Sequence, residues 1–309
     1  MSISIVVPVY NSERTLDELV RRLQAVLLPI EREFEILLIN DGSADGSWAR
    51  ISALVEHQPH VRGVNLARNY GQHNALLCGI RLARNDVVVT LDDDLQNPPE
   101  EIPRLLKSLE QGFDVVYGTS LSPQHGFFRR VAVRILKIVL RHVLGNDLAE
   151  MTSPFRAFRR SICKAFADYS NPFVSIDVLL TWGTSRFTHI TVQHVSRQHG
   201  RTNYKFTTLM ILAINMVTGF SILPLQMVSV LGLTFAFLGF AILGYIFIGY
   251  MIRGTTVAGF PFLASVIAIF SGVQLFALGI MGEYLARIHG RLMQRPVYVI
   301  QDQIGSSAA

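Results

Sequence analysis

The segment Val87-Val88-Val89-Thr90-Leu91-Asp92-Asp93-Asp94 decides the fold, because an apolar run leads directly into three adjacent aspartates. An apolar run of this length, ended by polar residues, is typical of a buried β-strand. Pro98-Pro99-Glu100-Glu101 follow, and they predict the first turn of a helix. A strand that leads into a helix is the repeating unit of α/β sheets, which bind ligands at the carboxyl ends of their strands.

The three aspartates predict a metal site. Like charges this close repel one another, so their grouping does not help folding. Mg²⁺ or Mn²⁺ fits this arrangement, because these ions prefer oxygen ligands and often bridge to a substrate phosphate. The alternative is a solvated acidic loop that binds nothing, and the position at a strand end favours the metal site.

The alternation of strand and helix patterns extends in both directions from this segment. Strands are predicted at residues 4–9, 34–39, 61–66, 87–91 and 115–118, with helices between them. Such repeated units predict a mainly parallel sheet with helices on both faces. Polar residues follow four of the strands, at 10–11, 40–41, 68–69 and 92–94, which is the layout of a nucleotide site. The sequence contains neither the glycine-rich dinucleotide fingerprint nor a P-loop.

The second half of the chain predicts membrane insertion. No charged residue occurs from 206 to 252, and none between Arg253 and Glu283. Because a bilayer span needs about 20 apolar residues, we predict transmembrane helices at 224–250 and 257–282, joined as a hairpin. Arginines and lysines flank both ends of this hairpin, which places both ends on the cytoplasmic side. No signal peptide is expected, because Met1 leads directly into a strand pattern.

Two further segments are predicted to lie on the membrane surface. Residues 127–144 form a basic amphipathic helix whose cations recur every three or four residues, at Arg130, Arg134, Lys137 and Arg141. Such a helix binds an anionic membrane, although an ordinary surface helix with a solvated basic face is the alternative. Arg129 begins this helix, and an arginine at a helix N-terminus forms an anion site. Residues 205–223 are interpreted as a second interfacial helix, between a catalytic domain at 1–204 and the hairpin, and residues 283–309 as a cytoplasmic tail.

Four motifs in the first hundred residues match a known family. They are Val7-Pro8-Val9-Tyr10-Asn11, Ile39-Asn40-Asp41-Gly42-Ser43, Arg68-Asn69-Tyr70-Gly71-Gln72-His73 and Asp92-Asp93-Asp94-Leu95-Gln96-Asn97-Pro98-Pro99-Glu100. Together they resemble the family-2 glycosyltransferases of the GT-A fold, and among them the polyprenyl-phosphate glycosyltransferases. The resemblance covers nearly the whole chain, including the membrane hairpin.

The resemblance implies an activity and its partners. It implies inverting transfer of a sugar from a nucleotide sugar, expected to be a UDP-sugar, to undecaprenyl or another polyprenyl phosphate. The product would serve a cell-envelope glycan or the modification of lipid A. The enzyme is expected to be a multi-pass protein of the inner membrane with a cytoplasmic catalytic domain and cytoplasmic termini. The resemblance also implies a homo-oligomer such as a tetramer, and it implies no nucleic-acid partner.

The resemblance also assigns roles to individual residues. It implies that a divalent metal is bound by Asp92, Asp94 and Gln96. The donor-binding residues that it implies are Pro8, Tyr10, Glu13, Asp41, Asp93, Arg197 and Gly200. The residues that it implies for the acceptor phosphate are Arg129, Arg130 and Arg156, and those for catalysis are Asp94, Arg129 and Arg156.

Three positions depart from the family pattern. Asn203 replaces a lysine, for which Lys205 is a possible substitute, and Ser12 replaces a glutamate that Glu13 follows. Asp93 stands where alanine is common, so we expect it to bear on the choice of sugar.

A lipid phosphate is mostly a dianion at pH 7, so it needs no general base, and catalysis reduces to positioning and charge stabilisation. Two alternatives remain open at this point. A processive polysaccharide synthase would carry a Q-x-x-R-W motif, which the sequence lacks. A membrane-tethered nucleotide-sugar-binding protein without activity would bind donor and metal without turnover.

Overall fold

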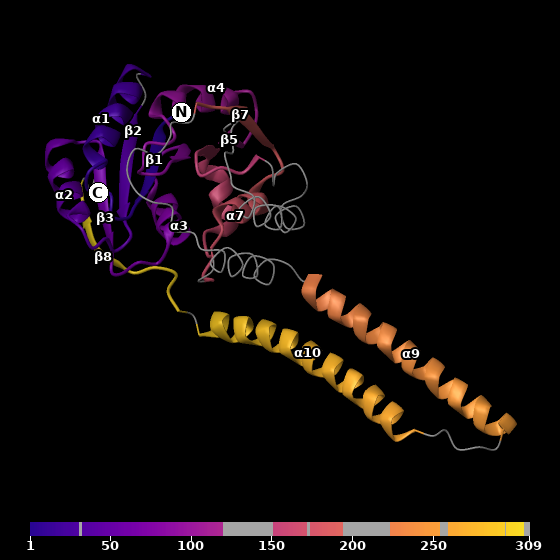
Figure 1. Cartoon of the computed structure of the whole chain (residues 1–309). Coiled ribbons are helices and arrows are strands. Elements are labelled where there is room, and N and C mark those ends of the chain that lie inside the picture. Colours follow the sequence, from indigo (N-terminus) through magenta and orange to yellow (C-terminus); the bar gives the residue numbers. More distant parts are fainter. Residues whose placement is uncertain are drawn as a thin grey trace. The chain divides into compact units, whose positions relative to one another are not determined.

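The computed structural model describes residues 1–30, 33–119, 151–171, 174–193, 223–253, 259–293 and 295–305 (Figure 1). The chain divides into two compact units. Unit 1 comprises Met1–Met210 with Gln294–Ala309, and unit 2 comprises Ile211–Met293. The basic helix predicted at 127–144 and nearly all of the interfacial segment at 205–223 lie outside the described residues.

The described part of unit 1 is built on a mixed, mainly parallel sheet of order β7-β5-β6-β4-β1-β2-β3-β8. Strand β1 pairs in parallel with β2 and β4, whereas β6 lies antiparallel between β4 and β5. The strands are β1 (Ile3–Val9), β2 (Phe34–Asn40), β3 (Val61–Leu66), β4 (Val87–Thr90), β5 (Val115–Thr119), β6 (Arg156–Arg159), β7 (Phe187–Thr191) and β8 (Ile300–Ile304). This arrangement confirms the predicted α/β fold.

Helices cover both faces of this sheet, as predicted. The helices are α1 (Leu16–Leu27), α2 (Ser47–His57), α3 (Gln72–Leu82), α4 (Ile102–Glu110) and α7 (Ile176–Gly183), with 3₁₀ turns η1 (Leu28–Ile30), η2 (Pro99–Glu101) and η3 (Arg160–Phe166). Alternate residues of β1 point to opposite faces. Ile5 and Val7 therefore join one core with α1, α2 and α4, and Val6 joins another with α3, η3 and α7. Because both faces are buried, the strands read as nearly continuous apolar runs.

Strand β8 follows the two long apolar helices in the sequence. It pairs antiparallel with β3, placing Asp302 opposite Asn65 and Ile304 opposite Gly63. The segment that we interpreted as a tail, 283–309, therefore contains the last part of a long helix and a strand that completes the edge of the sheet. Residues 295–305 thus belong to the same folded unit as the first strands.

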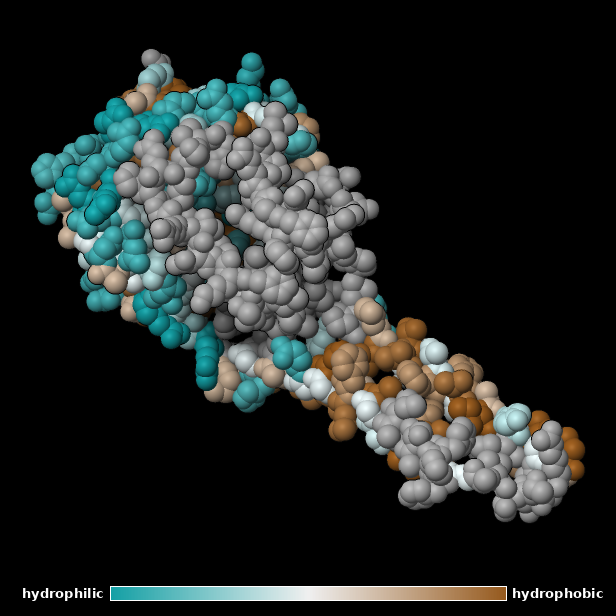
Figure 2. Space-filling model, in the orientation of Figure 1, coloured by the Kyte–Doolittle hydropathy of each residue, from teal (hydrophilic) through white to brown (hydrophobic). Residues whose placement is uncertain are grey.

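Unit 2 contains two long helices in its described part, α9 (Leu223–Arg253) and α10 (Phe260–Leu292). They pack against each other, and the rings of Phe235 and Phe270 meet edge to face with centroids 6.0 Å apart. By length and hydropathy, one helix of the described residues could cross a membrane, over Leu225–Gly249. Figure 2 shows hydrophobic colour over the described residues of these helices, whereas the described surface of unit 1 in that view is mainly hydrophilic.

Candidate active site

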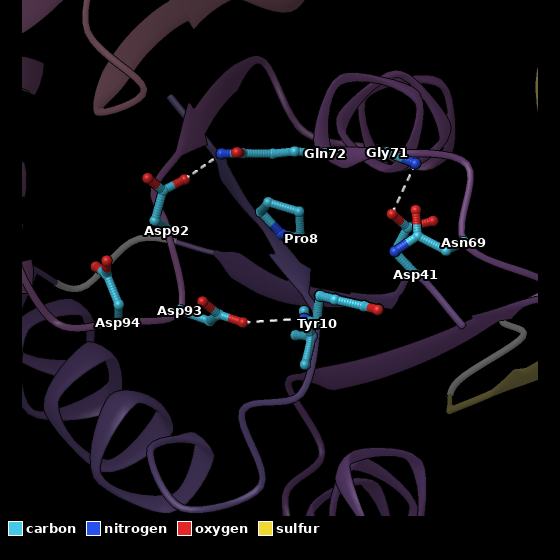
Figure 3. A pocket seen from close by; sticks show the side chains of 10 residues that line it. Pro8, Tyr10, Asp41, Asn69, Gly71, Gln72, Asp92, Asp93 and Asp94 are labelled. Carbon is cyan, nitrogen blue, oxygen red and sulfur yellow. Dashed lines mark hydrogen bonds between the residues drawn. The ribbon is translucent and has the colours of Figure 1, made fainter. Parts of the chain in front are cut away.

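A pocket of about 310 Å³ lies where several parallel strands end (Figure 3). It takes residues from the end of β1 and from the segments that follow β2, β3 and β4. The residues that line it are Pro8, Val9, Tyr10, Asp41, Asn69, Gly71, Gln72, Asp92, Asp93 and Asp94. The predicted convergence of polar strand ends is therefore confirmed.

Asp41 joins the segment after β2 to the segment after β3. Its side chain accepts hydrogen bonds from the backbone N–H groups of Tyr70 at 2.7 Å and Gly71 at 2.8 Å. The residue is 2% exposed, and burial raises the pKa of its carboxyl, while the two N–H groups act in the opposite direction. Gly71 precedes α3 with a φ of 93°, a left-handed value that glycine adopts without strain. Asp41 therefore orders the edge of the pocket on which Asn69 and Gln72 lie.

Asp93 joins the segment after β4 to the end of β1. Its Oδ2 accepts the backbone N–H of Tyr10 at 3.1 Å, and Figure 3 shows the side chain turned towards Tyr10. Burial is the main cause that raises the pKa of the Asp93 carboxyl, and the hydrogen bond from Ser12 lowers it. Asp93 thus has a structural role that the sequence did not indicate. Its predicted bearing on the choice of sugar stays a prediction.

Asp92 and Asp94 are the pocket residues best suited to bind a metal. Asp92 Oδ1 accepts a hydrogen bond from the Gln72 side-chain amide at 2.5 Å, and Asp94 Oδ1 accepts the backbone N–H of Gln96 at 3.1 Å. The described residues include no cluster of three or more acidic, histidine or cysteine side chains that would enclose an ion. Mg²⁺ is commonly bound by one or two carboxylates together with substrate phosphates. The donor set fits a metal of that kind, and Asp92 and Asp94 are the candidate protein ligands.

The predicted roles of Gln96 as a metal ligand and of Glu13 as a donor contact stay predictions. Neither is among the residues that line the pocket. Gln96 contributes its backbone N–H to Asp94. The Glu13 carboxylate accepts the N–H of Gly46 at 3.3 Å, and the Glu13 N–H donates to Asp45 at 3.2 Å, so Glu13 joins the segment before α1 to the start of α2.

Arg156 is buried behind the acidic segment. It is 1% exposed and forms an ion pair with Asp177 at the start of α7. Its Nε donates to Thr90 Oγ1 at 3.0 Å, and Tyr117 donates to the Asp177 carboxylate at 3.0 Å. A side chain so enclosed is not among those that line the pocket, and its predicted direct contact with the acceptor phosphate stays a prediction. Because Thr90 ends the strand that leads to Asp92, Arg156 is placed to position the acidic segment.

Besides Val9 at the end of β1, sequence reasoning assigned no individual role to three pocket residues, Asn69, Gly71 and Gln72. The polar cluster after the third strand and the motif at 68–73 were signals that could have identified them. Four predicted site residues lie outside the described residues, namely Arg129, Arg130, Arg197 and Gly200.

Several known proteins are similar to this chain in sequence. A family model described as glycosyl transferase family 2 matches residues 4–166. The undecaprenyl-phosphate 4-deoxy-4-formamido-L-arabinose transferase of Pseudomonas fluorescens is 36% identical over 310 residues, covering 99% of this chain and 91% of that protein. The enzyme of the same name from Enterobacter sp. is 37% identical over 302 residues, covering 97% of this chain and 92% of that protein.

A solved structure shares the fold. The crystal structure of glucosyl-3-phosphoglycerate synthase from Mycobacterium tuberculosis in complex with Mn²⁺, UDP-glucose and phosphoglyceric acid has a TM-score of 0.53 and 18% identity. The match covers 71% of this chain and 79% of that chain.

Proposed function

This chain belongs to glycosyl transferase family 2, and from that premise we propose that it transfers a sugar from a nucleotide-sugar donor to undecaprenyl phosphate. The observation that carries the proposal is the meeting of Asp41, Asp92 and Asp94 in one pocket at the strand ends. Relatives that are 36% and 37% identical over nearly their whole length are named as transferases to this lipid phosphate.

The pocket is the proposed donor site. Pro8, Tyr10 and Asp41 would contact the base and ribose of the nucleotide, and a UDP-sugar is the proposed donor. Asp92 and Asp94 would hold Mg²⁺ or Mn²⁺, which when bound supplies positive charge to the departing nucleoside diphosphate. Because Gln72 donates to Asp92 and the backbone N–H of Gln96 donates to Asp94, the chain holds both carboxylates in place before the donor arrives.

The acceptor phosphate needs no base, because its attacking oxygen is already ionised at neutral pH. That oxygen forms a bond to the anomeric carbon while the bond from this carbon to the diphosphate oxygen breaks. The nucleoside diphosphate leaves with the electron pair, and an in-line displacement of this kind inverts the anomeric centre. Arg129 and Arg130 remain the proposed contacts of the acceptor phosphate, and Arg197 and Gly200 remain proposed contacts of the donor.

The membrane arrangement is also a proposal. We propose that α9 and α10 both cross the inner membrane and that unit 1 is cytoplasmic, with the segment 127–144 on the membrane surface. The pairing of β8 with β3 supports this arrangement. The chain leaves unit 1 before α9 and returns to it after α10, so it must cross the membrane an even number of times. Crossing by α9 therefore requires crossing by α10. A homo-oligomer remains a proposal from the resemblance alone.

The sugar proposed first is 4-deoxy-4-formamido-L-arabinose, which the relatives' names contain, and its transfer would serve the modification of lipid A. In the test, membranes that contain the full chain are supplied with undecaprenyl phosphate and a panel of UDP- and GDP-sugars. Mass analysis of the lipid then identifies the sugar. A lipid-linked monosaccharide with one donor is the expected result. A polymer would favour a processive synthase, and donor binding without any product would favour a protein that only binds nucleotide sugars.

Two variants make this test specific for the site. Asp94→Ala is expected to lower transfer at least a hundredfold, because the charge of the leaving diphosphate loses its main stabilisation. Asp168→Ala removes an exposed carboxylate outside the pocket and is expected to have no effect. Chelation of divalent ions should abolish wild-type transfer, and added Mg²⁺ or Mn²⁺ should restore it. Full activity of Asp94→Ala in the presence of chelator would overturn the metal role.

A further inference from the structure

A second cavity, of about 660 Å³, lies at the end of the sheet opposite to the active-site pocket. Asp86 immediately precedes β4, and Arg159 is the last residue of the antiparallel β6, where it pairs with Val87. The active-site pocket lies beyond the other end of β4. The residues that line the second cavity are Met1, Ile80, Arg81, Asp86, Arg159, Arg160, Ser161, Cys163, Lys164, Phe166 and Ala167.

The cations of this cavity outnumber its anions. Arg81 donates to the backbone carbonyl of Tyr169 at 2.6 Å, and Arg160 donates to the carbonyl of Ala83 at 3.2 Å. A carbonyl satisfies a donor but leaves the positive charge unpaired. Within the described part of the chain, neither these arginines nor Lys164 forms an ion pair with a carboxylate.

Among the residues that line the cavity, one, Asp86, is acidic, and its charge offsets one of these positive charges. Asp86 accepts hydrogen bonds from the backbone N–H and the hydroxyl of Ser2, at 3.2 and 3.3 Å. Arg159 differs from the other cations because it has a carboxylate partner, Asp114, at 3.5 Å. The charge that remains for an occupant of the cavity is therefore positive.

The walls between these cations are partly apolar. Ile80 and Phe166 belong to the core beneath the cavity and also line it. Burial raises the pKa of the Cys163 thiol to about 12, so this thiol is neutral and adds no negative charge. A cavity of this volume lies within the range of small-molecule sites, about 300–1,000 Å³.

We propose that this cavity binds a phosphate-bearing anion at a site separate from the active-site pocket. Arg160 and Lys164 contact the phosphate oxygens, since guanidinium and ammonium groups form their strongest hydrogen bonds with such oxygens. Ile80 and Phe166 contact the less polar part of the same ligand. The phosphate belongs either to a lipid head group or to a soluble compound, which share the same recognition chemistry.

The test measures binding of inorganic pyrophosphate to the full chain in nanodiscs of phosphatidylcholine, by calorimetry. A metal chelator is present, so that the donor pocket lacks the ion that would hold pyrophosphate there. Lys164→Glu reverses one charge in the cavity, and Lys107→Glu reverses the charge of another exposed lysine, on α4. Lys164→Glu is expected to weaken pyrophosphate binding about tenfold or more, the loss of one charge-assisted hydrogen bond, while Lys107→Glu changes it less than twofold.

Nanodiscs that also contain phosphatidylglycerol distinguish the two sources of phosphate. If phosphatidylglycerol weakens pyrophosphate binding to the wild-type chain but not to Lys164→Glu, a lipid head group competes for the cavity. Unchanged binding identifies a soluble phosphate compound. The proposal is overturned if wild-type chain binds no pyrophosphate, or if Lys164→Glu and Lys107→Glu have equal effects. Equal melting temperatures of the two variants exclude misfolding as the cause of a difference.

Discussion

Gly42 lies where the segment after β2 meets the segment after β3, and it has a φ of 62°. A Cβ at this position would lie 2.5 Å from the carbonyl carbon of Arg68 and from the nitrogen of Asn69. Gly42→Ala therefore adds backbone strain and also pushes these two segments apart. We expect a loss of about 2 kcal/mol or more in the free energy of unfolding, and a higher KM for the donor because Asn69 lines the pocket.

A second glycine separates the two causes. Gly112 has a φ of 102°, but a Cβ there would meet nothing within 4 Å. Gly112→Ala thus tests backbone strain without the collision. Melting temperature and donor KM of both variants are the measurements. If Gly112→Ala raises the donor KM as much as Gly42→Ala does, contact between the two segments is not the cause.

Asp93 gives a prediction about pH. Burial raises its pKa in the folded chain, so this group favours folding while it is protonated. That contribution is fully present below the pKa that this carboxyl has in the unfolded chain, about 3.9. It is lost as the pH rises through the pKa of the same carboxyl in the folded chain. Asp93→Asn stays neutral at every pH and keeps an oxygen for the N–H of Tyr10. It should melt at a higher temperature than wild type at pH 8, and the difference should disappear towards pH 4.

The matched control for this pH series is Asp168→Asn, which changes an exposed carboxyl group. It should show no such pH-dependent gain. A lower melting temperature of Asp93→Asn at pH 8 would mean that the charged carboxylate stabilises the fold through its hydrogen bonds despite its burial.

At the level of single residues, sequence alone identified the positions that follow a strand. Tyr10, Asp41 and Asp92 were found because a polar residue directly after an apolar run marks the end of a parallel strand. The burial of Arg156 was not predicted, because its environment comes from Asp177 and Tyr117, which are distant in the sequence. A local pattern does not reveal that a side chain is buried by such partners.

Strand β8 is linked through side chains to the segment that follows β2, which contributes Asp41 to the pocket. The Asn65 amide donates to Asp302 on β8 at 3.1 Å, and the Asn40 amide donates to Asn65 at 2.7 Å. Asn40 immediately precedes Asp41 and accepts the N–H of Ser43 at 3.4 Å. These contacts support the segment that follows β2.

Asp302→Ala removes the first of these contacts. We expect the KM for the donor to rise about two- to fivefold, the effect of losing one partly exposed hydrogen bond, with a smaller change in kcat. Gln303→Ala truncates the next side chain of the same strand, which is exposed, and should leave both constants unchanged. Steady-state kinetics with varied donor measure the difference. An equal rise in KM for both variants would show that the strand as a whole, rather than Asp302, supports the pocket.

At the level of elements, the parallel strands could be predicted and β8 could not. Strands buried on both faces are continuous apolar runs, which a sequence displays directly. Strand β8 alternates only weakly, as Ile300-Gln301-Asp302-Gln303-Ile304. Its partner Asn65 lies 237 residues before Asp302. Pairing at that separation depends on where the intervening helices return the chain, and no local pattern encodes this.

For the whole molecule, the position of β8 restricts how the chain can cross a membrane. Residues up to Met210 and residues from Gln294 onward belong to unit 1, whereas α9 and α10 lie in unit 2. Since unit 1 folds on one side of the bilayer, the residues between α9 and α10 must lie on the opposite side if α9 crosses. The hydropathy of Leu225–Gly249 supports that crossing. A strand that the sequence did not predict thus supports the predicted hairpin, which stays a prediction.

Thiol labelling of intact cells tests this topology. Thr255→Cys introduces a thiol between α9 and α10, and we expect a membrane-impermeant maleimide to label it in intact cells, because this position would face away from the cytoplasm. Ser306→Cys introduces a thiol after β8 and should be labelled only after the membrane is permeabilised. Cys78 and Cys163 lie in unit 1 and are buried or half-buried, so the wild-type chain serves as the background. If neither introduced thiol reacts until permeabilisation, α9 and α10 do not cross the membrane, and the enzyme instead lies on its cytoplasmic surface.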